Sequence, residues 1–182
     1  MRYFPNTGII KIFLFSFSIL HFSSCASGSS HTMTHRSQQK DSSLEQKMRV
    51  RIVDFARKFE HLPYKKGGKT ERGFDCSGFV YYVLKNFDIE MACSAQEQCK
   101  EGKTIELDQV KSGDLIFFGD KSKIHHVGIV TERQKNALFV IHSSSSNGVI
   151  EENVLQSDYW LKRIKSFKDL NSYRPVKLAA FK

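Results

Sequence analysis

The stretch GFDCSGFVYYVLKNF, Gly73 to Phe87, decides how the folded part of this chain is organised. Asp75 is a good helix N-cap, because its short carboxylate can accept a hydrogen bond from the free N–H groups of a first turn. Apolar side chains then recur at the spacing of one helix face, at Phe79, Val80, Val83, Leu84 and Phe87. The pattern predicts a buried helix that carries Cys76 in its first turn.

A cysteine at the start of a helix is a candidate nucleophile. The positive end of the helix dipole and the unpaired N–H groups favour the thiolate, which predicts a lowered pKa for Cys76. Gly78, in the same turn, has no side chain to block the close approach of another segment. On these residues alone, a buried and unreactive cysteine is the commoner case. Catalysis therefore depends on partners elsewhere in the chain.

The rest of the chain indicates an α+β domain. Residues 44–59 have the pattern of an amphipathic helix, and SAQE fits a capping box in which Ser94 starts a second short helix. Three apolar, β-branched runs follow, and a tight turn at Asn147-Gly148 comes before a fourth. Because the helices come first and antiparallel strands later, α+β is the expected class.

Two histidines on neighbouring predicted strands could serve the thiol. If residues 126–131 and 137–142 form a hairpin with Gln134 at the centre of its turn, His126 lies directly opposite His142. Strand side chains alternate between faces, so the two imidazoles share a face about 5 Å apart and can form a hydrogen bond. Gly128 lies on the same face, where we expect it to leave room for the helix that carries Cys76.

The three side chains form a possible catalytic set: Cys76 as nucleophile, His126 as general base and acid, and His142 as the group that orients His126. His125 falls on the opposite strand face, so we expect it to be structural or exposed. A satisfied core histidine is the alternative for His126. A zinc or copper site of Cys76, His126 and His142 is another, which their wide separation in the sequence neither supports nor excludes. We predict no metal.

The ordered motifs of the chain, over residues 44–170, resemble those of the NlpC-type family of papain-like bacterial cell-wall cysteine peptidases. The matching motifs are PYKKGG (63–68), GFDCSGFV (73–80), SGDLIFF (112–118), HVGIV (126–130) and VIH (140–142). The resemblance implies a papain-like fold with N-terminal helices on an antiparallel sheet. It also implies that Cys76 is the nucleophile, His126 the base and His142 the orienting residue.

The same resemblance implies substrate-binding roles for Tyr64, Asp75 and Ser77. Tyr64 could instead be an aromatic residue that anchors its loop, and Asp75 could act only as the N-cap. Family members often have proline where this chain has Ser112, a departure that we expect to matter little.

The resemblance further implies an endopeptidase that hydrolyses amide bonds in peptidoglycan stem peptides through an acyl-enzyme, without a cofactor. An acyltransferase (transpeptidase) on the same fold and a non-catalytic wall-binding module remain alternatives. The presence of Cys76, His126 and His142 together argues against the binding module.

The N-terminal residues indicate where in the cell the protein is located. The apolar run IIKIFLFSFSILHF, which follows Arg2, ends in small residues before Cys25, a pattern typical of a signal peptide over residues 1–24. FSSC resembles a bacterial lipoprotein cleavage box, in which Cys25 becomes the lipidated first residue. An ordinary secretory signal with an incidental Cys25 is the alternative. We expect a membrane-anchored lipoprotein of the bacterial cell envelope, facing the periplasm or the wall.

The remaining boundaries follow from composition. Residues 25–43 are rich in Ser, Thr and Gln and predict a flexible tether, which leaves 44–182 as the peptidase domain. We expect Cys93 and Cys99 to be two separate thiols, although a bridge is conceivable if Cys93 lies outside the second helix.

The charge of the chain points to anionic partners but does not choose among them. The 182 residues carry 28 Lys and Arg against 19 Asp and Glu, a net charge of +9. That balance suits nucleic acid, membrane surfaces or acidic polymers. No motif that interleaves aromatic and basic residues supports nucleic acid, and we expect none to bind.

Overall fold

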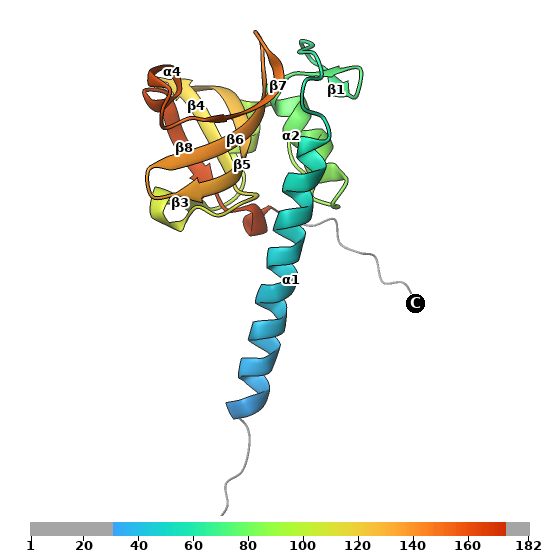
Figure 1. Ribbon diagram of the computed structural model, residues 1–182, viewed down its shortest axis with the longest axis vertical. Coiled ribbons are helices and arrows are strands. Elements are labelled where there is room, and N and C mark those ends of the chain that lie inside the picture. The colour runs from blue at the N-terminus through green and yellow to red at the C-terminus, as the bar shows by residue number, and fades with distance from the viewer. Residues whose placement is uncertain (1–30, 174–182) are drawn as a thin grey trace, which may run out of the picture.

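The computed structural model describes residues 31–173, with side chains from residue 41 onward. The predicted signal peptide and Cys25 therefore lie outside the described residues. Figure 1 shows a long helix, α1, that runs beside α2 and next to a curved sheet. The helices are α1 (His31–Arg57), α2 (Cys76–Lys85), α3 (Ala95–Lys100) and α4 (Asp158–Leu161), with 3-10 turns η1 (Leu107–Gln109) and η2 (Leu170–Ser172).

Six strands form the main sheet, in the order β3-β8-β4-β5-β6-β7, and every neighbouring pair is antiparallel. A separate ribbon pairs β1 with β2 just before α2. The strands are β1 (Lys69–Thr70), β2 (Gly73–Phe74), β3 (Thr104–Ile105), β4 (Leu115–Asp120), β5 (Lys123–Gln134), β6 (Ala137–Ser144), β7 (Gly148–Asn153) and β8 (Ile164–Lys168). The predicted α+β class is confirmed.

The sheet is buried on both faces, which explains why its central strands have nearly continuous apolar runs. One face packs against α1 and α2 and includes Leu115, Val127, Ile129 and Ile141. The other face closes over a second apolar cluster, which includes Ile116, Phe118, Val130, Val140 and Phe167. Four residues of the predicted apolar face of α2 are fully buried, namely Phe79, Val80, Val83 and Leu84, whereas Phe87 is half-buried and lies beyond the end of the helix at Lys85.

Helix α1 begins earlier than the sequence suggested. The predicted tether ended at residue 43, whereas the helix starts at His31, so the structure differs from a flexible tether over residues 31–43. Once the packed part of a helix has formed, each further residue adds a hydrogen bond without a new nucleus, and polar sequence can follow. In the described part of the chain, no helix combines the length and apolar character needed to cross a membrane.

The β5–β6 hairpin does not have the predicted register. Gln134 pairs with Ala137, so the turn is centred one and a half residues later than we predicted, and Val130 pairs with Val140. A β-bulge at Thr131 lies between these two parts of the ladder. His126 and His142 are therefore diagonal neighbours rather than directly opposite.

The bulge nevertheless places both histidines on one face. In the ladder beyond Thr131, Glu132 is opposite Phe139; continued without a bulge, this register would turn His126 and His142 to opposite faces. The extra residue shifts the alternation by one position and restores the shared face. The hydroxyl of Ser112 donates a hydrogen bond to the Thr131 carbonyl at 2.8 Å. Ser112, which stands where family members often have proline, thus provides the hydrogen bond that the carbonyl at the bulge needs.

The predicted role of Gly128 is wrong. Helix α2 packs on the other sheet face, where Val127 and Ile129 point. A Cβ on Gly128 would lie 2.5 Å from Val140 Cγ1 and 3.1 Å from His142 Cβ. The glycine therefore makes room for the neighbouring strand's side chains, His142 among them, and not for the helix.

A buried arginine joins α1 to the sheet. The Arg49 side chain is 1 % exposed, and its guanidinium donates to Asp114 Oδ1 at 2.6 Å, Asp169 Oδ1 at 2.8 Å and Glu45 Oε1 at 2.9 Å. It also donates to the carbonyl of Ser112 at 3.0 Å. The packed half of α1 is thereby fixed beside the start of β4.

Candidate active site

Cys76 is the first residue of α2, as predicted. Asp75 caps the helix by accepting a hydrogen bond from Gly78 N at 2.6 Å, and its other oxygen accepts from Gly67 N at 2.9 Å. The Ser77 hydroxyl is buried and donates to Asp75 Oδ1 and to the Cys93 carbonyl, each at 3.1 Å. Asp75 and Ser77 thus hold the helix start against its neighbouring loops.

The Cys76 thiol is half-buried and donates to the His125 carbonyl at 3.7 Å. Burial, and then the Asp75 carboxylate, raise the pKa of this thiol above its ordinary value. Backbone N–H groups of Ser77, Val127 and Cys76 itself oppose the rise without cancelling it. The predicted lowering of the pKa is therefore wrong, because the cost of burying the thiolate outweighs the stabilisation by the N–H groups at the helix start.

His126 and His142 do meet across the strands. The distance from His126 Nε2 to His142 Nδ1 is 2.8 Å, and the rings are nearly perpendicular, at 87°. His142 is fully buried. Burial, and secondarily His142, lower the pKa of His126 to about 3. The His126 ring is therefore neutral at neutral pH and able to accept a proton.

Two residues that the sequence analysis missed complete this cluster. Glu152 Oε1 lies 2.9 Å from His142 Nε2 and accepts a hydrogen bond from Trp160 Nε1 at 2.8 Å. Trp160 stacks on His126, with ring centroids 4.8 Å apart and an interplanar angle of 28°. The alternation of β7 could have found Glu152 once the pairing of His142 with Ile150 was known, because Glu152 is two residues further along the same face.

A cleft of about 670 Å³ brings these groups together. Cys76, His126 and Glu152 line it, and so does Tyr64 from the loop before β1. The carboxylate of Asp75 and the hydroxyl of Ser77 are occupied by the contacts described above, and these residues do not line the cleft. Further lining comes from the β4–β5 corner, the β6–β7 turn and α4, through Phe118, Gly119, Asp120, His125, Ser144, Ser145, Ser146, Asn147, Ser157, Tyr159, Trp160 and Arg163.

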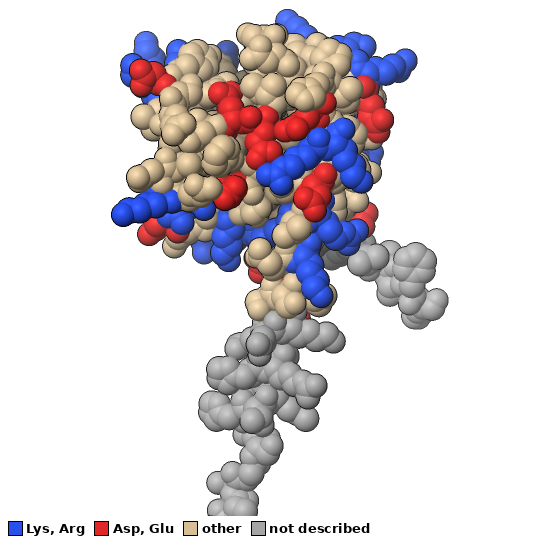
Figure 2. All heavy atoms as spheres, in the orientation of Figure 1, with Lys and Arg blue, Asp and Glu red and all other residues tan. Residues whose placement is uncertain are grey.

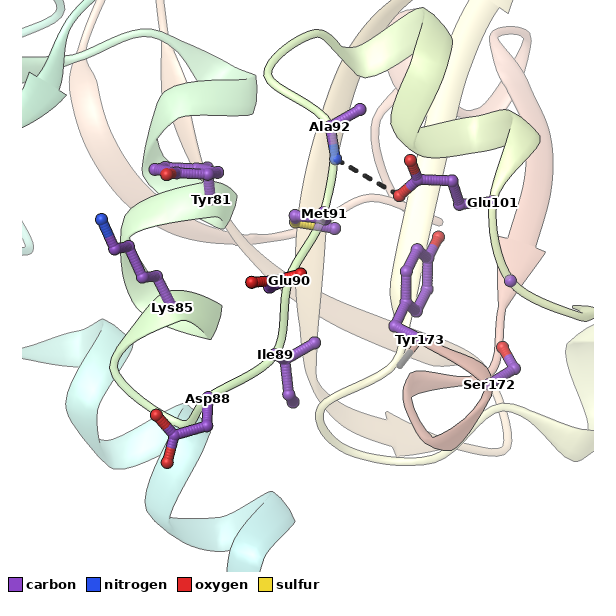
Figure 3. Close-up of a pocket in the computed structure, with 11 residues that line it drawn as sticks. Tyr81, Lys85, Asp88, Ile89, Glu90, Met91, Ala92, Glu101, Ser172 and Tyr173 are labelled. Carbon is purple, nitrogen blue, oxygen red and sulfur yellow. Dashed lines mark hydrogen bonds between the residues drawn. The ribbon is translucent and has the colours of Figure 1, made fainter. Parts of the chain in front are cut away.

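A larger cavity, of about 1060 Å³, lies elsewhere on the molecule. Figure 3 shows Tyr81 and Lys85 of α2 on one side, Glu101 and Tyr173 on the other, and the segment 88–92 between them. None of its lining residues is a cysteine or histidine, so it has no thiol–imidazole pair. Size alone would select the wrong pocket, and we place the candidate site in the smaller cleft.

The described residues form no cluster of three or more His, Cys, Asp or Glu side chains arranged to hold a metal ion. Over the same part of the chain, Cys93 and Cys99 are both free thiols. His125 is exposed and lies 3.0 Å from Asp120 Oδ1, outside the histidine pair.

The fold is that of a papain-like protein, and a cysteine at a helix start and a histidine on the antiparallel sheet line one cleft. The model of the NlpC/P60 family matches residues 61–169, and the chain belongs to this family. The family and fold expected from the motifs are both confirmed.

Among known relatives, the chain is 33% identical over 147 residues to the murein DD-endopeptidase MepS/murein LD-carboxypeptidase of Escherichia coli K12, covering 79% of this chain and 76% of that protein. It is 36% identical over 116 residues to the gamma-D-glutamyl-L-lysine dipeptidyl-peptidase of Bacillus subtilis, covering 62% and 38%. Among solved structures, the NlpC/p60 domain of peptidoglycan hydrolase SagA has a TM-score of 0.55 and 30% identity, covering 65% and 96%.

Proposed function

We propose that this chain is a cysteine endopeptidase that hydrolyses amide bonds in peptidoglycan stem peptides. One observation carries the proposal: the Cys76 thiol and His126 line the same cleft, and the buried His142 lies 2.8 Å behind His126. Membership of the NlpC/P60 family and the names of its relatives support peptidoglycan as the substrate.

Acylation begins with a neutral thiol and a neutral imidazole, as the directions of their pKa shifts imply. His126 takes the thiol proton while Cys76 Sγ attacks the scissile carbonyl carbon. The carbonyl oxygen becomes an oxyanion, which backbone N–H groups near Cys76 stabilise. His126 then protonates the amine nitrogen, the C–N bond breaks, and a thioester to Cys76 remains.

Deacylation uses the same groups in reverse. His126, again neutral, takes a proton from water as the water oxygen attacks the thioester carbon. The C–S bond breaks, the stem-peptide carboxyl group is released, and the thiolate recovers its proton from His126. His142 keeps His126 oriented in both steps, and no metal or organic cofactor takes part.

Substrate contacts follow the cleft lining. Tyr64 is 36% exposed and lies close enough to Cys76 for the thiol to help raise its pKa, after burial. We assign Tyr64 a direct role in binding substrate or stabilising the oxyanion. Asp75 and Ser77, which lie behind the nucleophile, shape the pocket indirectly by fixing the start of α2.

The test is mass spectrometry of purified peptidoglycan fragments incubated with the purified full chain, a Cys76→Ala variant and a chelator-treated sample. Cleaved stem peptides that disappear with Cys76→Ala and persist with chelator are expected, and their masses identify the bond. Cross-linked products would indicate an acyltransferase instead. A folded chain that binds the wall and yields no product would favour the wall-binding module.

The second part of the proposal concerns attachment: Cys25, which lies outside the described residues, is lipidated after removal of residues 1–24. Metabolic labelling with a fatty acid is expected to label the chain and to leave a Cys25→Ser variant unlabelled. Labelling of the Cys25→Ser variant would contradict the assignment.

Charge alone does not define a further partner. On the face drawn in Figure 2, a group of Asp and Glu side chains lies near the middle. Lys and Arg side chains lie beside it and at the edges, and they form no continuous basic stripe. This mixed face suits diffuse attraction to an anionic wall better than a nucleic-acid groove.

A further inference from the structure

Glu152 and Trp160 extend the histidine pair by one more group. Glu152 Oε1 is within hydrogen-bond distance of His142 Nε2, 2.9 Å, and Trp160 Nε1 donates to the same oxygen at 2.8 Å. His142 in turn lies 2.8 Å from His126. The contacts form an unbroken chain from an acceptor-only carboxylate to the proposed base.

We propose that Glu152 is a positioning residue that fixes the tautomers of His142 and His126 and stabilises the positive charge that forms on His126 during catalysis. Trp160 assists by holding the carboxylate and by stacking on His126. The inference rests on the proposed function, because it assigns the residues to that reaction.

Hydrogen-bond bookkeeping gives the tautomers. An ionised carboxylate can only accept, so the proton between Glu152 and His142 belongs to His142 Nε2. A neutral His142 then has its lone pair on Nδ1 and must accept from His126 Nε2–H. His126 Nδ1 is thereby left unprotonated as the base that takes the proton of Cys76.

The negative charge on Glu152 also reduces the energetic cost of forming a buried imidazolium on His126. Burial makes the His126 imidazolium costly, as its lowered pKa shows. Hydrogen bonds from His142 and Trp160 lower the pKa of Glu152, which keeps it anionic at neutral pH. The anion therefore favours the imidazolium through His142 at the moment when the thiol proton arrives.

The strand geometry explains why only one of two adjacent glutamates takes this role. Glu152 is opposite Val140 on the β6–β7 ladder and shares a face with His142, whereas Glu151 is opposite Ile141. Glu151 accepts from Thr131 Oγ1 at 2.6 Å and from Arg57 Nε at 2.8 Å, in a contact with α1. Glu151→Gln is therefore a matched control one residue away.

The other charged groups that line the cleft make contacts of their own, away from the hydrogen bonds that join Glu152, His142 and His126. Asp120 and His125 lie 3.0 Å apart and form their own pair. Arg163 lies over the ring of Tyr159 at 3.8 Å and donates to the Tyr159 carbonyl. The remaining titratable groups that line the cleft are Cys76 and Tyr64. Glu152 is the carboxylate that contacts His142.

The kinetic test compares Glu152→Gln, Glu152→Ala and Glu151→Gln in the full chain, with kcat and KM measured across pH on the fragment that the wild type cleaves. Glu152→Gln keeps an acceptor but removes a charge that favours protonated imidazole, so both limbs of the pH profile are expected to move about one unit lower. Glu152→Ala should lower kcat about 10- to 100-fold with little change in KM, the range seen for carboxylates that orient metal-binding histidines. Glu151→Gln should leave the profile in place.

A second arm needs no activity. Histidine ¹⁵N spectra of the full chain should show Nε2–H tautomers for both His126 and His142, and Glu152→Ala should redistribute the proton on His142. If the wild type is inactive but these tautomers change with Glu152, the proposed function fails, whereas the assignment that Glu152 fixes the histidine tautomers stands. Unchanged tautomers together with an unshifted pH profile would overturn the inference.

Discussion

At the scale of single residues, the resting protonation of the site is its most distinctive property. The Cys76 pKa is raised and the His126 pKa is lowered, so thiol and imidazole are both neutral near pH 7. A helix dipole acting alone would favour the thiolate. Here burial outweighs it, and the nucleophile forms as the proton moves.

This balance predicts how Cys76 reacts with iodoacetamide. Alkylation requires thiolate, so its rate should stay low at neutral pH and rise only on the alkaline side of an ordinary thiol. Peptide mass spectrometry can follow Cys76 and, as an exposed reference in the same chain, Cys93. A Cys76 rate that stays high down to mildly acidic pH would indicate a thiolate–imidazolium pair and contradict the prediction.

The sequence predicted those residues whose signals are local. Asp75 was identified as the cap, and Cys76 as the helix start, from neighbours within one turn. His126 and His142 were placed on one face by alternation alone. Glu152 could not be found in the same way, because its role depends on the β6–β7 register and on Trp160, neither of which a short window contains.

At the scale of elements, the β5–β6 hairpin shows how a wrong register can give the right face. Our prediction placed the centre of the turn too early and did not include the bulge. Each error alone would have turned His126 and His142 to opposite faces of the sheet, and together they cancelled. A bulge lacks a strong sequence signal, because what stabilises it is distant: Ser112 satisfies the Thr131 carbonyl, and Glu151 accepts from the Thr131 hydroxyl.

Deleting Thr131 should cost more stability than changing its side chain. The deletion would join the pairs Val130–Val140 and Glu132–Phe139 into one regular ladder, so the histidines keep their shared face, but both hydrogen bonds at the bulge, to Ser112 and Glu151, are lost. We expect Thr131→Ala, which loses one hydrogen bond, to lower the free energy of unfolding by roughly 1 kcal/mol, and the deletion to lower it by about twice as much. Denaturant titrations followed by circular dichroism would measure both. Equal stabilities for the two variants would show that the hydrogen bond from Ser112 does not stabilise the bulge.

At the scale of the whole molecule, Arg49 connects parts that the sequence analysis treated separately. The amphipathic pattern of residues 44–59 would leave a charged side chain on the solvent face, yet Arg49 is buried against Asp114 and Asp169. Helical periodicity gave no hint of this, because the acids that draw the side chain inward come from the turn before β4 and from the segment after β8.

Arg49→Ala should lower the free energy of unfolding by about 3–5 kcal/mol, because it leaves the buried Asp114 carboxylate without its cation. Arg57→Ala is the matched control: its ion pair with Glu151 is 41% exposed on the arginine side and should contribute about 1 kcal/mol or less. Urea unfolding of the two variants separates these cases. A similar loss in both would mean that the buried network does not hold α1 to the sheet.

If Cys25 carries a lipid, as proposed, helix α1 sets the height at which the enzyme works. The 27 residues of the whole helix form a rod of about 40 Å, at 1.5 Å for each residue. Figure 1 shows α4 and the β6–β7 turn, which border the cleft, at the end of the body away from the start of this rod. With a lipid on Cys25, the cleft would be carried at a set stand-off from the bilayer. The length of α1 would then fix the distance between the bilayer and the cleft, and so determine which layer of the wall the cleft can reach.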